Sequence, residues 1–372
     1  MRGEVIERLS DSLPEEHLDA IVCLSPAAVA HAAGFVVPSQ PLMRWRHAAI
    51  VISDSSEPSM LCVDMEESTV REASPGTRLE VWNEFGGDAM VGLANLIRER
   101  GAEKGRVGIE LGFLSVADYR RLCHELPDAE LVGCDELLAR IRQHKTADEL
   151  ELLKKLSQIA DGAILDAFRY VHAGSSEMDL AAALTHGVYA RGGQSISLMI
   201  VATGERSQLP NVGPSERTLE EGDICRVEIF PVIDGYHAGV CRTAVVGRPP
   251  AHALDIYGHL VKCRQDVIDH LVPGTPTSAV YAAFRKRFDE LKMPPISFVG
   301  HGIGVELHEE PYLAPFDKGV VEKDMVFGLD PLVYKTGYGY GMQVKDMVAI
   351  GDSGAQVLSD VSDADELFVI EP

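Results

Sequence analysis

The tetrapeptide Thr146-Ala147-Asp148-Glu149 has the pattern of a capping box, which starts a helix and so divides the chain. In such a box the Thr146 hydroxyl accepts a hydrogen bond from the N–H of Glu149, whose carboxylate reaches back to the N–H of Thr146. Apolar residues then recur at helical spacing up to His172-Ala173-Gly174, namely Leu150, Leu153, Leu156, Ile159, Ile164 and Phe168. We predict that a long amphipathic helix begins here and opens a second domain.

The part before this helix predicts a small α/β domain over residues 1–143. It contains short apolar runs of strand length and two stretches of helical spacing. The runs are 19–24, 48–52, 60–63, 106–109 and 130–132, and the helical stretches are 89–100 and 116–125. Strands that alternate with helices imply a layered sheet. Two domains agree with a length of 372 residues, which exceeds what one hydrophobic core normally serves.

Residues 144–372 predict a domain made of two similar halves. Each half has two helices followed by strands: helices 146–172 and 177–191 with strands 197–202, 224–232 and 241–246, then helices 254–271 and 280–291 with strands 326–329 and 347–350. Val171-His172-Ala173-Gly174 corresponds weakly to Leu271-Val272-Pro273-Gly274. We expect an α+β fold in which two related halves enclose a central site.

Charge and cysteine content exclude several classes of partner. A formal charge of −23 argues against nucleic acid and anionic membranes, because both would repel the chain. The sequence has no run of eighteen apolar residues and no signal-peptide pattern at its start, so we expect a cytoplasmic protein. Its seven cysteines are scattered without a CxxC pair, which favours reduced thiols over disulfides or zinc.

The richest chemistry lies in the stretch from Gly300 to Pro311. Gly300-His301-Gly302-Ile303-Gly304 places a histidine between glycines, where the backbone can approach a ligand closely. His308 follows seven residues later and heads His308-Glu309-Glu310-Pro311. Histidine is the usual proton carrier near neutral pH, so this stretch predicts an enzyme active site.

Several motifs in this order resemble the superfamily of creatinase, prolidase, aminopeptidase P and methionine aminopeptidase. The motifs are Arg142-Gln143-His144-Lys145-Thr146-Ala147-Asp148-Glu149, Glu221-Gly222-Asp223, Gly235-Tyr236, Arg242-Thr243, the two histidine motifs and Asp330-Pro331. The resemblance implies a creatinase-like α/β domain at residues 1–143, followed by a catalytic pita-bread domain at residues 144–372.

Most members of this superfamily are dinuclear metallohydrolases that use two aspartates, one histidine and two glutamates. Carried over by position, these ligands fall on Glu228, Gly239, His301, Asp330 and Lys345. A glycine offers no ligand, and an ammonium group repels a cation. We therefore expect no metal and no cofactor, with Lys345 paired instead to Glu228 or Asp330.

The segment from Phe230-Pro231 to Tyr236 looks closest to creatinase, the metal-independent branch, with ectoine hydrolase as a relative. Yet the proton-shuttling histidine of creatinase corresponds to Asn211, and the glutamate before Arg242-Thr243 corresponds to Cys241. Creatine itself is therefore an unexpected substrate. The resemblance nominates as substrate-binding residues Asn211, Tyr236, Arg242, Lys345 and Asp346.

For catalysis we expect His301 and His308 to handle protons and the developing oxyanion. Glu228 and Asp330 either orient water or only neutralise a lysine. Cys241 is a candidate nucleophile if a nearby cation or base activates it, and otherwise a packing residue.

Arg44 and Arg46 flank Trp45 just before a strand of the first domain. In creatinase-like dimers this region reaches the partner's site and binds the substrate carboxylate, a role that suits guanidinium groups. The alternative is a solvated edge anchored by Trp45. The resemblance thus implies a homodimer in which the first domain contributes to the partner's active site.

Together these patterns favour a metal-independent hydrolase that cleaves a C–N bond in a small amidine, amide or guanidino compound with a carboxylate. One alternative is a metallohydrolase of the Xaa-Pro dipeptidase or aminopeptidase type with altered ligands. The other is a catalytically inactive pita-bread module that binds peptides.

Overall fold

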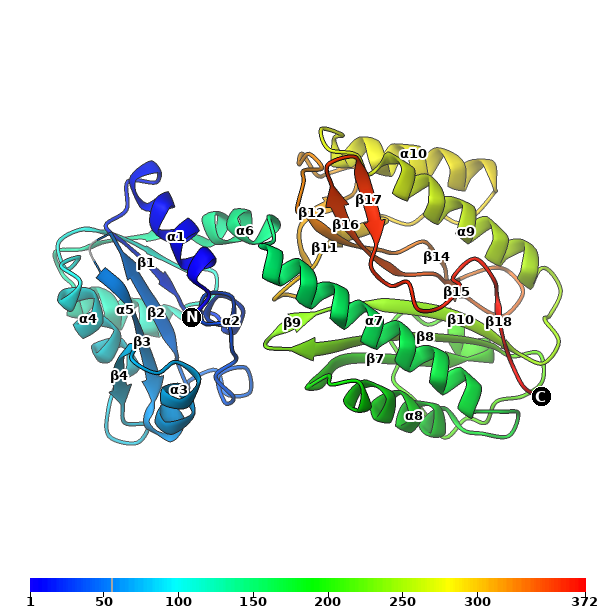
Figure 1. Cartoon of the computed structure of the whole chain (residues 1–372), viewed down its shortest axis with the longest axis horizontal. Coiled ribbons are helices and arrows are strands. Elements are labelled where there is room, and N and C mark those ends of the chain that lie inside the picture. Colours follow the sequence, from blue (N-terminus) through cyan, green and yellow to red (C-terminus); the bar gives the residue numbers. More distant parts are fainter. Residues whose placement is uncertain (55) are drawn as a thin grey trace. The chain divides into compact units, whose positions relative to one another are not determined.

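The computed structural model describes residues 1–54 and 56–372. The chain divides into two compact units, Met1–Arg142 and Gln143–Pro372. This division lies one residue before the boundary predicted from the capping box. In Figure 1 helices flank the sheet of the first unit, and helices also lie against the sheets of the second.

The first unit is built on a mixed sheet with the strand order β4-β3-β2-β1-β5-β6. Its elements are α1 (Gly3–Glu15), β1 (Ala20–Cys23), α2 (Pro26–Ala33), β2 (Ala49–Ser53), β3 (Ser56–Val63), η1 (Asp64–Glu66), α3 (Glu67–Ala73), β4 (Arg78–Trp82), α4 (Ala89–Glu99), β5 (Arg106–Ile109), α5 (Val116–Glu125), β6 (Glu130–Gly133) and α6 (Asp135–Gln143). The predicted α/β domain is confirmed.

Both faces of this sheet are covered. Successive residues of a strand point to opposite sides, so each strand contributes to two hydrophobic clusters. Ile21 and Cys23 pack in one hydrophobic cluster with residues of α1 and α2. Ala20 and Val22 pack in another with residues of α4 and α5. Buried on both sides, these strands appear in the sequence as continuous apolar runs, without alternation of apolar and polar residues.

The second unit contains two five-stranded sheets and a short two-stranded one. Its elements are α7 (Ala147–Tyr170), α8 (Glu177–Ala190), β7 (Ser195–Thr203), η2 (Gly204–Gln208), β8 (Ile224–Ile233), β9 (Tyr236–His237), β10 (Val240–Val246), α9 (Ala253–His270), α10 (Thr277–Glu290), β11 (Gly300–Gly302), β12 (Glu309–Leu313), β13 (Val326–Leu329), β14 (Leu332–Val333), β15 (Met342–Gln343), β16 (Asp346–Gly351), β17 (Gly354–Val357) and β18 (Phe368–Ile370). The sheet orders are β18-β10-β8-β7, with β9 on β8, and β12-β11-β13-β16-β17.

The two predicted halves are present as matching layers. Helices α7 and α8 lie on the sheet that contains β8 and β10, and α9 and α10 lie beside the sheet that contains β13 and β16 (Figure 1). The capping box is confirmed: Thr146 accepts from the N–H of Glu149, and Glu149 accepts from the N–H of Thr146 at 2.7 Å. The fold is therefore the α+β fold that the sequence predicts.

A backbone bridge joins β10 to the residue just before β16, where the halves meet. Cys241 and Lys345 exchange two backbone hydrogen bonds, with N···O distances of 3.2 and 3.1 Å. The Thr243 hydroxyl also donates to the carbonyl of Gln343 at 2.7 Å. The segment that carries Lys345 is thus attached to β10 as well as to its own sheet.

Two further observations complete the fold. Periodicity located the longer strands and most of the longer helices, but it gave no helix at α1, α2, α3 or α6 and no strand at β4. It also gave none of the short strands β9, β11, β12, β14, β15, β17 and β18. In the described part of the chain, no helix has both the length and the apolar character needed to cross a membrane.

Candidate active site

Strand β8 directs three side chains of its central part toward the seam between the halves. Arg226, Glu228 and Phe230 are spaced two residues apart, so they project from the same face of the strand. All three are buried. Each contacts a side chain from the segment that runs through β15 to β16, either Gln343 or Lys345.

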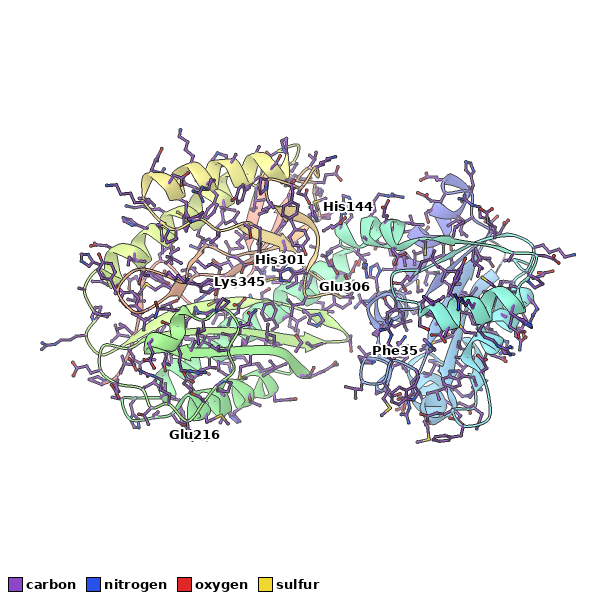
Figure 2. All side chains as sticks on the ribbon, turned by 180° about the vertical axis from the view of Figure 1, so that it is seen from behind. Phe35, His144, Glu216, His301, Glu306 and Lys345 are labelled. Atoms are coloured by element: carbon purple, nitrogen blue, oxygen red, sulfur yellow. The ribbon has the colours of Figure 1, made fainter. Side chains whose placement is uncertain are left out.

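The Lys345 ammonium is the centre of this site. Its Nζ lies 2.8 Å from Oδ1 of Asp330, 3.2 Å from Oε1 of Glu228 and 3.3 Å from Nε2 of His301. The ammonium therefore faces two carboxylate oxygens and one imidazole nitrogen. Nζ also lies 4.9 Å from the centre of the Phe230 ring, within the range of a cation–π contact. Figure 2 labels His301 and Lys345 near each other in the second unit.

Charges in this cluster balance without any added ion. Two carboxylates, Glu228 and Asp330, face the Lys345 ammonium and the Arg226 guanidinium, whose Nη1 is 4.0 Å from Oε2 of Glu228. Burial alone would raise the pKa of Asp330, but Lys345 and His301 hold it well below its ordinary value. Burial acts to lower the pKa of Lys345, and Asp330 and Glu228 raise it above its ordinary value. Both partners of this pair are therefore ionised at neutral pH.

Glycines make the room that the lysine occupies. A Cβ on Gly239 would lie 2.9 Å from Cε of Lys345 and 2.4 Å from Cε1 of Phe230, which is closer than such contacts occur. A Cβ on Gly328 would lie 3.2 Å from the same Cε atom. The space at position 239 is thus filled by the side chains of Lys345 and Phe230.

His301 lies on β11 with both ring nitrogens engaged. Nδ1 is 2.8 Å from the carbonyl of Gly302, which can only accept, so Nδ1 carries a proton. Nε2 faces Nζ of Lys345 and, at 3.3 Å, Oδ2 of Asp330. The ring is fully buried. His301 therefore holds the charged centre in place.

His308 is the histidine with access to solvent. Its ring stacks on His301 with 3.6 Å between centroids and 9° between planes, and Phe298 and Tyr312 border both rings. Its residue keeps an exposed surface, whereas His301 has none. Partial burial, reinforced by His301 and Lys345, lowers the pKa of His308 to about 4. At neutral pH this imidazole is uncharged and can accept a proton.

Cys241 points to the same side as Glu228, its partner in the β8–β10 register, but its thiol is unsuited to attack. The side chain is fully buried, and burial raises the pKa of the Cys241 thiol well above its ordinary value. A nucleophilic cysteine needs a lowered pKa. The structure thus argues against the nucleophile hypothesis and for the packing alternative.

Arg242 and Asp346 are not brought to the cluster, because each follows a site residue by one position and so points to the opposite face. They form a buried ion pair at 2.9 Å behind it. Arg242 also pairs with Asp161 at 2.9 Å, and Asp346 with Arg264. Their predicted role in substrate binding finds no support in this geometry, which makes them part of the framework.

Tyr236 and Asn211 also lie apart from the charged centre. The Tyr236 hydroxyl is buried and donates to Oε1 of Glu149 at 2.7 Å, at the start of α7. Asn211 is exposed in the loop whose neighbouring carbonyl, that of Pro210, accepts from Nη2 of Arg226 at 3.0 Å. Tyr236 supports the fold, and Asn211 remains a predicted substrate contact on a loop tied to a site residue.

Arg44 and Arg46 lie in the first unit. Arg46 pairs in bidentate fashion with Glu84, with both N···O distances 2.8 Å. Arg44 donates to the carbonyl of Phe113 at 3.3 Å and lines a cavity of about 510 Å³ with Trp45. Arg46 is thus engaged within its own unit, and a contribution of Arg44 to a partner's site in a homodimer stays a prediction.

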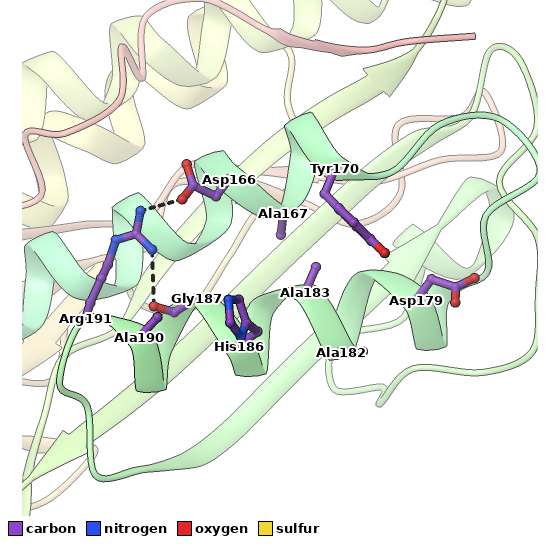
Figure 3. A pocket seen from close by; sticks show the side chains of 10 residues that line it. All are labelled: Asp166, Ala167, Tyr170, Asp179, Ala182, Ala183, His186, Gly187, Ala190 and Arg191. Carbon is purple, nitrogen blue, oxygen red and sulfur yellow. Dashed lines mark hydrogen bonds and ion pairs between the residues drawn. The ribbon is translucent and has the colours of Figure 1, made fainter.

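A separate cavity of about 440 Å³ lies between α7 and α8 (Figure 3). Ala167, Ala183 and Gly187 form part of its wall, and Arg191 bridges Asp166 and the carbonyl of Gly187 at one end. No predicted site residue lines it. We assign it no part in the chemistry.

Sequence reasoning missed Arg226, Phe230 and Gln343. Gln343 accepts from Nη1 of Arg226 at 3.0 Å and donates to Oδ1 of Asp330 at 3.4 Å, so it links two charged residues of the centre. The sequence did contain a signal for them, because residues two apart on a strand share one face. Arg226 and Phe230 lie two residues from Glu228, and Gln343 lies two residues from Lys345.

Comparison with known proteins identifies the family. Residues 151–352, more than half of the chain, match the model of metallopeptidase family M24. The chain belongs to this family. Residues 6–144 match the Creatinase/Prolidase N-terminal domain. The resemblance inferred from the motifs is confirmed at this level, and so is the pairing of a creatinase-type N-terminal domain with a pita-bread domain.

Relatives of this M24 chain include proteins named Xaa-Pro dipeptidases. The Xaa-Pro dipeptidase of Pyrococcus furiosus is 25% identical over 361 residues, 96% of this chain and 97% of the relative. The solved Xaa-Pro dipeptidase from Bacillus anthracis is 26% identical with a TM-score of 0.85, covering 98% of this chain and 99% of that chain. X-Pro aminopeptidase from Thermotoga maritima, at 22% identity and TM-score 0.84, shares the fold. The expected closeness to creatinase is not supported by these relatives.

The residues of this M24 member do not fit the metal pair that the family name implies. Among residues 1–54 and 56–372, no group of three or more His, Cys, Asp or Glu is arranged to hold a metal ion. The carboxylates of Glu228 and Asp330 already share the Lys345 ammonium, and position 239 has neither a ligand nor space for one. A divalent cation would have to displace a buried, paired ammonium.

Proposed function

We propose that this M24-family hydrolase cleaves a C–N bond in a small substrate that bears a carboxylate, using the Lys345 ammonium where relatives of its family use metal. The observation that carries the proposal is the contact of one Nζ atom with Asp330, Glu228 and His301 within 3.3 Å. A fixed positive charge in a buried site stabilises negative charge that develops during hydrolysis.

In the proposed reaction His308 moves the proton. Its neutral imidazole takes a proton from water while the water oxygen adds to the carbonyl or amidine carbon. The C–N bond then breaks, and the imidazolium returns the proton to the leaving nitrogen. Oε1 of Glu228 accepts from Lys345, whereas Oε2 lies 4.0 Å from Arg226, beyond hydrogen-bond distance, and so can orient the water.

An Xaa-Pro dipeptide is the second candidate substrate. It is favoured by the names of relatives that cover nearly the whole chain at about a quarter identity, 25% for one of them. Such a dipeptide also has a C–N bond next to a carboxylate, so the same centre serves both candidates. The two differ in the group that carries the scissile nitrogen.

One set of measurements separates these possibilities. Purified protein is analysed for metal by mass spectrometry and assayed, with and without a chelator, on Xaa-Pro dipeptides, N-acyl amino acids and guanidino acids. We expect turnover that survives the chelator and no stoichiometric metal. A tightly bound metal pair with chelator-sensitive cleavage would show a metallopeptidase. Absence of all turnover, with stabilisation by peptides, would show a binding module.

A further inference from the structure

A second buried ion pair lies next to His308 and is not part of the charged centre. Nζ of Lys145 donates to Oε2 of Glu309 at 2.7 Å, and the two side chains are only 2% and 4% exposed. Glu309 follows His308 directly in the chain. Removing two charges from water is unfavourable, so a pair of this kind fixes geometry more than it adds stability.

The loop that carries His308 is folded around the Glu309 carboxylate. Oε1 of Glu309 accepts from the N–H of Glu306 at 3.1 Å, and the carbonyl of Glu306 accepts from the N–H of Gly304 at 3.1 Å. A Cβ on Gly304 would lie 2.9 and 3.0 Å from the two carboxylate oxygens. His308 lies between the anchored residues 306 and 309, so its position follows that of the carboxylate.

Lys145 is itself held by a rigid element. Its backbone N–H donates to the carbonyl of Asp324 at 2.9 Å, and the next residue, Thr146, begins α7 with the capping box. Glu149 of that box also accepts from the Tyr236 hydroxyl at 2.7 Å. The cation that meets Glu309 is therefore fixed by the start of a long helix.

We propose that Lys145 and Glu309 are positioning residues that hold the His308 ring in its stack on His301. The inference deepens the proposed function and rests on it where it assigns the proton transfer to His308. The buried ion pair closes the loop at residue 309, the loop places the ring over the charged centre, and the ring then faces the reacting water.

The test compares Glu309→Gln and Lys145→Met with the parent, using Lys323→Met as the control. Lys323 forms an ion pair of the same length, 2.7 Å to Asp352, but with 53% and 84% of the side chains exposed. We expect the first two variants to lower kcat by about 100-fold, the loss typical of a catalytic group displaced by about 1 Å. KM should change less than about threefold. The control should keep both constants.

A second readout does not depend on turnover. Nuclear Overhauser effects between the labelled rings of His301 and His308 report the stack, with centroids 3.6 Å apart. They should weaken in Glu309→Gln and Lys145→Met and persist in Lys323→Met. If the single variants fail to fold, Lys145→Met combined with Glu309→Met removes both charges, leaves none unpaired, and should also lose the ring contact.

The proposal is overturned if folded variants keep the ring contact and the parent kcat, or if only KM changes. If the parent protein shows no hydrolase activity at all, the proposed function fails. The ring contact still decides whether the buried pair positions His308.

Discussion

Cε of Lys345 fills the space into which a side chain at position 239 would project, 2.9 Å from an ideal Cβ on Gly239. Two positions far apart in the chain are therefore coupled by volume. A residue larger than glycine at position 239 and a lysine at position 345 exclude each other, and this exclusion leads to the first prediction.

Gly239→Ala should destabilise the protein by about 1–3 kcal/mol, because the added methyl group overpacks a buried site against Phe230 and Lys345. Urea denaturation measures the change. Gly258→Ala is the matched control: it lies within α9, no atom lies within 4 Å of its Cβ position, and alanine should stabilise the helix by about 0.5–1 kcal/mol. Equal stability of Gly239→Ala and the parent would contradict the packing described.

Lys345→Met should cost about 3–5 kcal/mol of unfolding free energy at pH 7, because Glu228 and Asp330 lose the ammonium that both contact. Turnover should also be lost. Chemical denaturation and steady-state kinetics measure the two effects, and Lys323→Met provides an exposed control. A variant as stable as the parent would show that the buried ammonium is not what holds the two carboxylates.

The same variant should change the response to acid. In the parent the pKa of Asp330 is depressed, so its ion pair contributes stability above the ordinary pKa of an aspartate, about 3.9. That contribution is lost as the pH falls through the depressed value. Without Lys345 the depression should largely disappear, and unfolding free energy should fall less steeply between about pH 4 and pH 2. Denaturation curves across this range measure the slope, and identical slopes would contradict the coupling.

Turnover by the parent should remain high down to about pH 4, because the pKa of His308 is lowered to about 4 and only the neutral ring accepts a proton. A pH profile of kcat/KM measures the acid limb. A limb near pH 6.5, the ordinary histidine value, would mean that another group or an unperturbed ring carries the proton. His308→Ala should lose most of the activity, with no such limb in what remains.

Cys241 should resist alkylation in the native protein at pH 8, because its thiol is fully buried and its pKa is raised. Mass spectrometry after iodoacetamide treatment identifies the modified thiols. Cys123, which is only half-buried, is the internal comparison and should react first. Rapid labelling of Cys241 with loss of activity would restore the nucleophile hypothesis.

Periodicity predicted helices and strands, whereas the motifs predicted which distant residues come together in the site. The two kinds of prediction have different physical reasons. The long helix from Thr146 and strand 326–329 follow from capping chemistry and apolar runs, which are local. The convergence of Glu228, Asp330, His301 and Lys345 came from the resemblance to a known family, because contacts between distant segments leave no local pattern. In the structure, Lys345 contacts Glu228 and Asp330, and His301 contacts Asp330.

The places of the other predicted site residues have an equally physical origin. Arg242 and Asp346 stand next to site residues in the motifs, but neighbours on a strand face opposite ways. Tyr236 belongs to the conspicuous pair Gly235-Tyr236, yet its hydroxyl donates to Glu149 at the start of α7. The positions of these side chains depend on which face of each strand lies toward the site. That face is fixed only by how the two sheets pack together.

Because Arg226, Glu228 and Phe230 occupy alternate positions of β8, removal of one residue from the strand just before them would turn all three away from the seam. The apolar Val227 and Ile229 would then face Lys345, and an ammonium surrounded by hydrocarbon would lose its counter-charges. The register of β8 thus decides whether this protein has a charged centre at all.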